Sequence, residues 1–357
     1  MLESGARQSM RPEMTMVGSR AILARAARRG LALLLCLTPL LGASASLVEA
    51  DVSAEALARA SAAVVGVEVR ALPDATTRDA LGALRNGSGV VIGDDGLVLT
   101  IGYLLLEADE VDLRLADGRL VPARVRALDL ATGFGLVQAL WPPGLPAAPL
   151  APSSALAPGE PLLLVTGGTD GTITPATLST RAPYSGFWEY HIEQALFTRP
   201  ARTDHGGAGL FNRRGELLGI GSLLALETPD EYESGPGSLF VPIDLLRPIY
   251  AELRSRGTTS ASRRAWLGVD CVQRAEGVRV QRVVPDSPAA DAGAEPGDLI
   301  RRIDGVPVGD RAALYRRLWS GAVERQVTLE VLRDGEAVDL TMHSIDRAQA
   351  LRRAGGI

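Results

Sequence analysis

The chain has 357 residues, 46% of them hydrophobic, and its 37 basic residues are all arginine because the sequence contains no lysine. A Schiff-base lysine, a Ser-Lys dyad and a phosphate-loop lysine are therefore excluded. Two cysteines are too few for a four-cysteine zinc site, and the formal net charge of −5 argues against nucleic acid as a partner.

The N-terminal segment has the pattern of a secretory signal peptide. Several arginines precede an apolar run over residues 31–41, and the small residues Ala43, Ser44 and Ala45 follow it. We expect a signal peptide over 1–45 and a periplasmic location, with attachment to the membrane only if the segment stays uncleaved. Cleavage after Ala45 would leave a net charge of about −9.

Residues 51–256 contain short apolar or alternating runs separated by Gly, Pro and Asp, a pattern typical of β-strands. The first set of predicted strands covers 63–69, 89–92, 97–101, 111–115 and 134–140. A connector rich in Pro, Ala and Ser follows over 142–158. The second set covers 161–165, 172–179, 209–211, 216–224 and 238–241. We predict two antiparallel barrels or sandwiches, closed by one helix over 242–256.

A smaller module follows this β-rich region. Residues 257–264 begin with small side chains and are predicted to form a linker. Residues 265–345 have the size of one small domain, and 346–357 form a polar tail for which a frayed helix is expected. Cys271 alternates with Leu267 and Val269, which predicts a small buried side chain and not a reactive thiol.

Five motifs in the first region occur in a specific order. They are Gly87–Ile92 (GSGVVI), Gly96–Thr100 (GLVLT), Asp117–Arg119 (DGR), Gly215–Ile220 (GELLGI) and Phe240–Ile243 (FVPI). In this order and spacing the region resembles the HtrA/Deg family of trypsin-like serine proteases. The resemblance implies a mainly β fold with a trypsin-like double β-barrel over 51–256.

The second module resembles the PDZ domain that follows the protease in this family. Its motifs are Ser287–Gly293 (SPAADAG), Pro296–Ile300 (PGDLI), Ile303–Gly305 (IDG) and Val308. The resemblance implies a small α+β domain over 265–345 that binds polypeptide C-termini or unfolded proteins. Relatives in this family are often trimers, which makes a homo-oligomer a further expectation.

The sequence departs from the family pattern at all three positions of the catalytic triad. Tyr103 holds the place of the histidine base, Gly133 that of the aspartate, and Gly206 that of the serine nucleophile. Acyl transfer by serine needs an oxygen nucleophile, a base and a group that orients the base. The sequence therefore predicts a pseudoprotease with no catalytic residues at these positions.

The PDZ module keeps the residues that the family uses to hold a peptide. The stretch Trp266-Leu267-Gly268-Val269 matches the loop that captures a terminal carboxylate with backbone N–H groups. A helix over 310–319, with Asp310 as its N-cap, is predicted to line the groove. Leu314 and Leu318, four residues apart on this helix, complete the expected pocket together with Leu267 and Val269.

Three functions remain open at this point. The favoured one is an exported, proteolytically inactive adaptor or chaperone-like protein that works through its PDZ domain without a cofactor. The second is an active endopeptidase of periplasmic protein quality control with an unusual site that uses Asp204 and His205, residues that would otherwise be polar groups on an exposed turn. The third is a protein that binds a transition metal through His191 and His205, with Asp204 or Glu189 as a third ligand.

Overall fold

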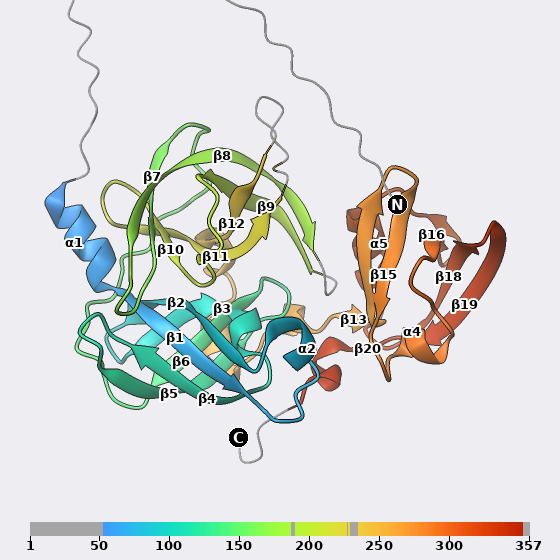
Figure 1. The fold of residues 1–357 in the computed structure, drawn as a ribbon, viewed down its shortest axis with the longest axis horizontal. Coiled ribbons are helices and arrows are strands. Elements are labelled where there is room, and N and C mark those ends of the chain that lie inside the picture. Colours follow the sequence, from blue (N-terminus) through green and yellow to red (C-terminus); the bar gives the residue numbers. More distant parts are fainter. Residues whose placement is uncertain (1–52, 187–189, 227, 229–234, 353–357) are drawn as a thin grey trace, which may run out of the picture. The chain divides into compact units, whose positions relative to one another are not determined.

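The computed structural model describes residues 53–186, 190–226, 228 and 235–352 (Figure 1). The predicted signal peptide and Glu189 lie outside these residues. All described residues belong to one compact unit, Ala50–Ile357. It begins with helix α1 (Ala54–Ala62), whose N-terminus is capped by the Ser53 hydroxyl, which accepts a hydrogen bond from the Ala56 N–H. None of the described helices is long and apolar enough to cross a membrane.

The first half of the chain forms a closed antiparallel barrel, barrel 1, with the strand order β1-β2-β3-β6-β5-β4. Its strands are β1 (Val64–Ala71), β2 (Leu84–Gly93), β3 (Leu97–Ile101), β4 (Ala108–Arg114), β5 (Leu120–Leu128) and β6 (Phe134–Ala139). A short helix α2 (Arg78–Leu81) precedes β2, and the 3₁₀ turn η1 (Gly102–Leu105) follows β3.

Residues 161–242 form barrel 2, also closed, with the strand order β10-β11-β12-β9-β8-β7 (Figure 1). Its strands are β7 (Pro161–Val165), β8 (Ile173–Gly186), β9 (Tyr190–Arg199), β10 (Gly209–Phe211), β11 (Leu217–Ala225) and β12 (Gly237–Pro242). The expectation of barrels or sandwiches is thus resolved in favour of two barrels.

The apolar runs read from the sequence reflect burial on two sides. In β3, Val98 belongs to the core inside barrel 1, whereas Leu97 and Leu99 belong to a larger cluster that also contains Phe197 and Phe211 of barrel 2. Every residue of β3 is buried. Strands buried on both faces lose the polar alternation of a half-exposed strand, and for this reason β3 appears in the sequence as a continuous apolar segment.

In the barrel region the sequence reading was wrong for the closing helix, and it missed two strands and the helices α1 and α2. The helix predicted over 242–256 is only α3 (Tyr250–Arg256), preceded by the 3₁₀ turn η2 (Ile243–Leu245). Pro248 explains the difference, because proline has no N–H to donate and keeps the residue before it out of the helical region. Strand β5 was missed because Pro122 and two arginines interrupt its apolar pattern, and β9 because its pattern is mixed.

The PDZ module is a six-stranded antiparallel sheet with two helices. Its strands are β14 (Val269–Arg274), β15 (Gly277–Val283), β16 (Leu299–Ile303), β17 (Val306–Pro307), β18 (Gln326–Arg333) and β19 (Glu336–His343). The sheet order β14-β15-β16-β18-β19, with β17 paired to β16, places β14 at an edge. The helices are α4 (Pro288–Asp291) and α5 (Arg311–Trp319), and the predicted N-cap of α5 is confirmed, since the Asp310 carboxylate accepts the Ala313 N–H at 2.7 Å.

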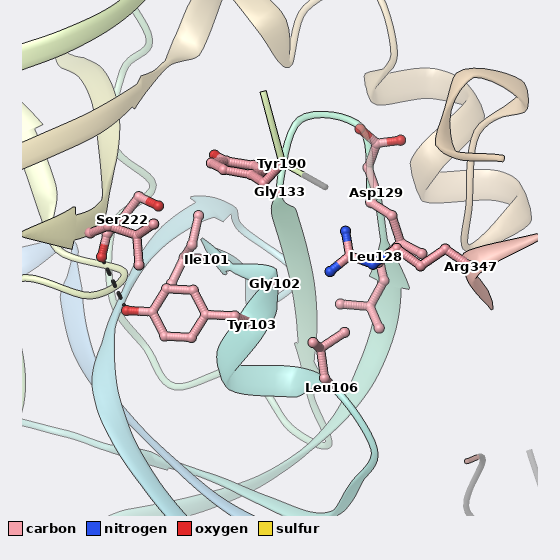
Figure 2. Close-up of a pocket in the computed structure, with 12 residues that line it drawn as sticks. Ile101, Gly102, Tyr103, Leu106, Leu128, Asp129, Gly133, Tyr190, Ser222 and Arg347 are labelled. Carbon is pink, nitrogen blue, oxygen red and sulfur yellow. Dashed lines mark hydrogen bonds between the residues drawn. The ribbon is translucent and has the colours of Figure 1, made fainter. Parts of the chain in front are cut away.

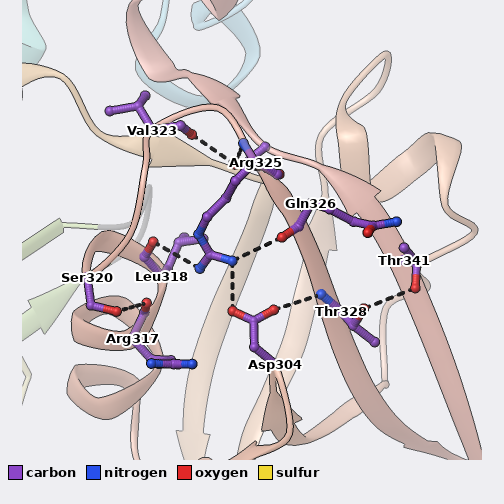
Figure 3. A network of polar contacts seen from close by, with 10 residues as sticks. Asp304, Arg317, Leu318, Ser320, Val323, Arg325, Gln326, Thr328 and Thr341 are labelled. Carbon is purple, nitrogen blue, oxygen red and sulfur yellow. Dashed lines mark hydrogen bonds and ion pairs between the residues drawn. The ribbon is translucent and has the colours of Figure 1, made fainter.

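A polar network fixes the C-terminal end of α5 against the sheet (Figure 3). The Arg325 guanidinium donates to the Asp304 carboxylate at 2.7 Å and to the Leu318 carbonyl at 3.4 Å. Asp304 also accepts the Thr328 N–H. Asp304 and Gly305 both have positive φ, which is the geometry of the tight Asp-Gly hairpin turn. The turn thus holds the Asp304 carboxylate where it binds Arg325, and the Arg325 guanidinium in turn contacts the C-terminal end of α5.

The segments on either side of the PDZ sheet are held in place. Residues 257–264, predicted as a linker, contain the 3₁₀ turn η3 (Ser260–Ser262), and Thr259 within them is 2% exposed. Strands β13 (Ala265–Trp266) and β20 (Ile345–Asp346) pair with each other, and the 3₁₀ turn η4 (Arg347–Ala350) follows. The predicted linker is held against the barrel region, because the Thr259 hydroxyl donates to the Asp129 carboxylate and the Ser262 hydroxyl accepts the Leu130 N–H.

Candidate functional site

The three triad positions come together between the two barrels. Tyr103 lies in η1, Gly133 directly precedes β6, and Gly206 lies in the loop before β10. The Gly102 N–H donates to the Gly133 carbonyl at 2.6 Å. A Cβ atom added to Gly206 would lie 2.3 Å from the Tyr103 hydroxyl oxygen. The positions assigned from the motif spacing are thus adjacent in the fold.

Two tyrosine side chains occupy the space that triad side chains would need. Tyr103 fills the place of a side chain at 206, and its hydroxyl donates to the Ser222 carbonyl at 3.1 Å. Tyr190 fills the place of a side chain at 133, because a Cβ there would lie 3.0 Å from its ring and 3.1 Å from its hydroxyl oxygen. The Tyr190 hydroxyl also donates to the Thr132 carbonyl at 3.3 Å. Tyr190 and Ser222 were not predicted from the sequence, since no pattern indicates which distant side chain fills a vacated position.

Neither tyrosine is suited to act as a base near neutral pH. Burial raises the pKa of Tyr103 to about 12, and burial also raises the pKa of Tyr190 well above its ordinary value. Both hydroxyls therefore stay protonated at physiological pH and act as hydrogen-bond donors to carbonyl oxygens. A general base works best with a pKa near the operating pH.

A small cavity of about 50 Å³ remains beside these side chains (Figure 2). Figure 2 shows Tyr103 with its bond to Ser222, Tyr190 beside Gly133, and Arg347 of η4 next to Leu128. Most of the wall is apolar. Its remaining lining residues are Ile101, Gly102, Leu106, Leu128, Asp129, Leu130 and Leu223.

Asp129 is the one carboxylate of this wall, and its oxygens serve the local structure. One oxygen accepts the N–H and the hydroxyl of Thr132, which shapes the turn before Gly133. The other accepts the Thr259 hydroxyl at 2.5 Å. The side chain is 1% exposed. Asp129 therefore joins the triad region to the segment that leads to the PDZ module, a role that no sequence motif indicated.

The histidines considered as metal ligands or as an alternative catalytic pair do not converge. His205 is 1% exposed, its Nε2 lies 3.2 Å from the Leu223 carbonyl oxygen, and its ring packs on Phe240. The Asp204 carboxylate instead pairs with Arg202. The interpretation of His205 as part of an exposed turn is wrong, because the ring points into barrel 2. Burial lowers its pKa despite carbonyl contacts that raise it.

His191 lies in a separate environment on β9. Its Nδ1 is 2.8 Å from the Ser185 hydroxyl oxygen, and its Nε2 is 3.1 Å from a Glu193 carboxylate oxygen. Among the residues that the structure describes, no group of three or more His, Cys, Asp or Glu side chains is placed to hold a metal ion. The described ligand candidates His191, His205 and Asp204 are thus engaged in separate local contacts.

In the PDZ module, the predicted loop and helix flank the edge strand β14. Trp266, Leu267, Gly268 and Val269 connect β13 to β14, and α5 packs alongside β14. Leu314 and Leu318 are 2% and 1% exposed and share one core with Leu267 and Val269. The Arg311 guanidinium at the start of α5 donates to the Cys271 carbonyl of β14 at 3.2 Å. An edge strand beside a helix is the arrangement that accepts an added peptide strand.

Gly268 lies where a side chain has no room. Its φ is +88°, and a Cβ atom there would lie 2.3 Å from the Cβ of Ser287. Ser287 caps α4 by accepting the Ala290 N–H. The glycine therefore lets the loop pass directly over the N-terminus of α4.

Two closed barrels that meet at the triad positions, followed by an edge-strand module, define a trypsin-like peptidase fold with a PDZ domain. Comparison with protein-family models agrees: residues 87–220 match the trypsin-like peptidase domain, and residues 265–343 match the PDZ domain.

Curated relatives include the periplasmic serine endoprotease DegP. The protein from Escherichia coli K12 is 30% identical over 270 residues, covering 72% of this chain and 56% of that one. DegP of Salmonella typhimurium LT2 is 29% identical over 278 residues, covering 74% and 58%. The chain thus spans little more than half the length of these two relatives.

Solved structures with the same fold include the HtrA-type protease AlgW. AlgW with a decapeptide gives a TM-score of 0.50 at 22% identity, covering 82% of this chain and 98% of that one. A variant of AlgW with a tripeptide gives 0.51 at 24% identity, covering 82% and 97%. From the domain matches, the relatives and the fold together, the chain belongs to the HtrA/DegP-like family.

Proposed function

We propose that this chain is an exported, proteolytically inactive member of the HtrA/DegP-like family that binds polypeptide C-termini or unfolded proteins through its PDZ domain as an adaptor or chaperone-like protein. The periplasmic relatives and the arginine-rich apolar N-terminus support a periplasmic location. A trimeric assembly stays a prediction from the family.

The observation that carries the loss of activity is the filling of the triad site. Tyr103 occupies the space of a nucleophile at 206, and Tyr190 occupies the space of an aspartate at 133. Losing members of a serine-protease triad lowers kcat by about a millionfold. Because Gly206 offers no side-chain oxygen and both tyrosine hydroxyls are held protonated, the site supports no acyl transfer by the family mechanism.

The observation that carries peptide binding is the match of residues 265–343 to the PDZ domain, in which β14 is the edge strand beside α5. A peptide in extended conformation gains main-chain hydrogen bonds from such an edge, and backbone N–H groups of the preceding loop can hold a terminal carboxylate. AlgW, whose structures are described with a decapeptide and a tripeptide, shares this fold. This likeness supports peptide binding as the retained function.

The test of inactivity compares casein digestion by the natural chain and by engineered variants. We expect no cleavage by the natural chain. The triple variant Tyr103→His, Gly133→Asp, Gly206→Ser is also expected to be a poor enzyme, because residue 133 has a φ of +81° and its Cβ would lie 3.0 Å from the Tyr190 ring. Adding Tyr190→Ala removes the contact but not the backbone strain. Cleavage by the natural chain that disappears in His205→Ala or Asp204→Ala would establish the alternative endopeptidase.

The test of peptide binding uses fluorescence anisotropy with labelled peptides that end in an apolar residue. We expect binding of the free-carboxylate form and none of the amidated form. Equal affinity for both forms, or no binding across a library of C-terminal peptides, would refute PDZ recognition of chain ends.

A further inference from the structure

A second and much larger cavity, of about 570 Å³, adjoins the small one through Leu128 and Leu130 but shares no lining residue with the PDZ groove. Strand β5 and the residues after it form one wall, and the segments that enter and leave the PDZ sheet form the others. Its apolar lining consists of Leu105, Ala108, Val125, Ala127, Leu128, Leu130, Ala348 and Leu351. This volume lies in the range of small-molecule sites, which are commonly lined by apolar groups with a few polar ones.

Four arginines surround this cavity: Arg126, Arg256, Arg263 and Arg352. Arg256 pairs with Glu252, and Arg263 pairs with Asp346. Within the described residues, the exposed side chain of Arg126 makes no ion pair, and neither does that of Arg352. The cavity therefore offers at least two cationic groups that are not neutralised by a neighbouring carboxylate.

The two carboxylates of the lining are already engaged. Glu107 accepts five hydrogen bonds, from the N–H and hydroxyl groups of Thr76 and Thr77 and from the Arg352 N–H. Asp346 accepts from Arg263 and from the Ala348 N–H. The remaining charge at the cavity is thus positive, which favours an anionic ligand.

The surroundings of β5 argue against a peptide as that ligand. β5 pairs with β4 over residues 120–123 and with β6 over residues 123–128, and past the β4 pairing the Leu128 N–H donates to the Gly257 carbonyl at 3.0 Å, so this wall leaves few main-chain groups for a peptide to pair with. A bound peptide would need partners for its own N–H and C=O groups, whose burial without hydrogen bonds is costly. An apolar ligand that has no peptide backbone does not incur this cost.

We propose that the cavity binds a medium-chain monocarboxylate of the fatty-acid type. The carboxylate lies at Arg126 and Arg352, and the hydrocarbon chain lies against the leucines and alanines of the lining. The site is separate from the PDZ groove, and its occupancy does not depend on the proposed peptide function.

Isothermal titration of the full chain with decanoate, below its micelle-forming concentration, tests this site. Decanoate is expected to bind. 1-Decanol has the same hydrocarbon chain without the charge, and it is expected to bind at least about tenfold more weakly, because it lacks the hydrogen bond between a charged carboxylate and arginine. Arg126→Ala is expected to weaken decanoate by about tenfold. Arg124→Ala, an exposed arginine on the same strand outside the lining, is the matched control and leaves the affinity unchanged.

Two further experiments distinguish binding in this cavity from binding in the PDZ groove and from an effect of misfolding. Ala348→Trp fills the cavity and is expected to abolish binding while the thermal midpoint stays within a few degrees. Saturation with a C-terminal peptide leaves decanoate binding intact. The proposal is overturned by absence of heat with decanoate, by equal affinity for decanol, by full competition with the peptide, or by an Arg126→Ala variant that binds as the natural chain does.

Discussion

The hydroxyl oxygen of Tyr103 lies where a side chain at Gly206 would begin: a Cβ added to Gly206 would be 2.3 Å from it. The residue in place of the base therefore excludes the nucleophile. The side chains at these two predicted triad positions are thus coupled through direct steric contact.

Gly206→Ser is expected to destabilise the protein without creating a nucleophile that can react. Overpacking of this kind costs about 1–3 kcal/mol, and the backbone at Gly206 does not need a positive φ, so the contact with Tyr103 dominates. Urea unfolding of Gly206→Ser, Tyr103→Phe and the double variant measures the coupling. Strictly additive effects would show that the two positions do not touch.

Stability is expected to fall at alkaline pH because of Tyr103. Its folded pKa of about 12 lies above the unfolded value near 10, so between these values the folded state holds a proton that the unfolded chain releases. The contribution is complete below pH 10 and decreases as pH rises through 12, by up to about 3 kcal/mol. The pH dependence of urea unfolding in the natural chain and in Tyr103→Phe measures it, and the variant should show a shallower decline. Identical slopes would rule out this assignment.

Glu107 is expected to anchor the C-terminal segment to barrel 1. Burial raises the pKa of Glu107, but hydrogen bonds from the Thr77 hydroxyl and from the N–H groups of Arg352, Thr77 and Thr76 outweigh it, so the pKa lies below its ordinary value. This stabilisation is present above about pH 4.5 and is lost as pH falls through the folded pKa. Glu107→Gln should cost about 1–3 kcal/mol.

Glu110→Gln is the matched control for Glu107, since this neighbouring carboxylate is exposed and pairs only with Arg70 at the surface. Its change should stay below about 1 kcal/mol. Thermal unfolding at pH 7 and pH 4 compares the two, and equal losses in both variants would contradict an anchoring role.

Gly268→Ala is expected to damage the peptide-binding loop more than Gly293→Ala does. Both glycines have positive φ, +88° and +77°, but only Gly268 has another residue where its Cβ would lie; no atom lies within 4 Å at Gly293. The clash with Ser287 should add about 1–3 kcal/mol to the backbone strain common to both. Peptide affinity should fall at least about tenfold in Gly268→Ala, with Gly293→Ala close to the natural chain. Comparable losses in both variants would mean that the contact with Ser287 is unimportant.

The sequence by itself determined the family, the mainly β class and most strands of the two barrels, and it predicted Tyr103, Gly133 and Gly206 at the triad positions. It could do so because motif spacing and apolar runs are local properties of the chain. The motif order also located Tyr103, Gly133 and Gly206 although they lie in different segments. The strands that it missed, β5 and β9, carry mixed patterns, and in β5 Pro122 and two arginines interrupt the alternation.

Only the tertiary structure decided what fills the vacated site. Tyr190 lies 57 positions beyond Gly133 in the sequence and enters its space because β9 crosses beside the turn that Asp129 shapes. The burial of His205, the anchoring of residues 259–262 and the arginine-lined cavity likewise arise from distant segments meeting. These contacts depend on barrel closure and packing, which bring together side chains that are far apart in the sequence. No local sequence pattern indicates that they are neighbours.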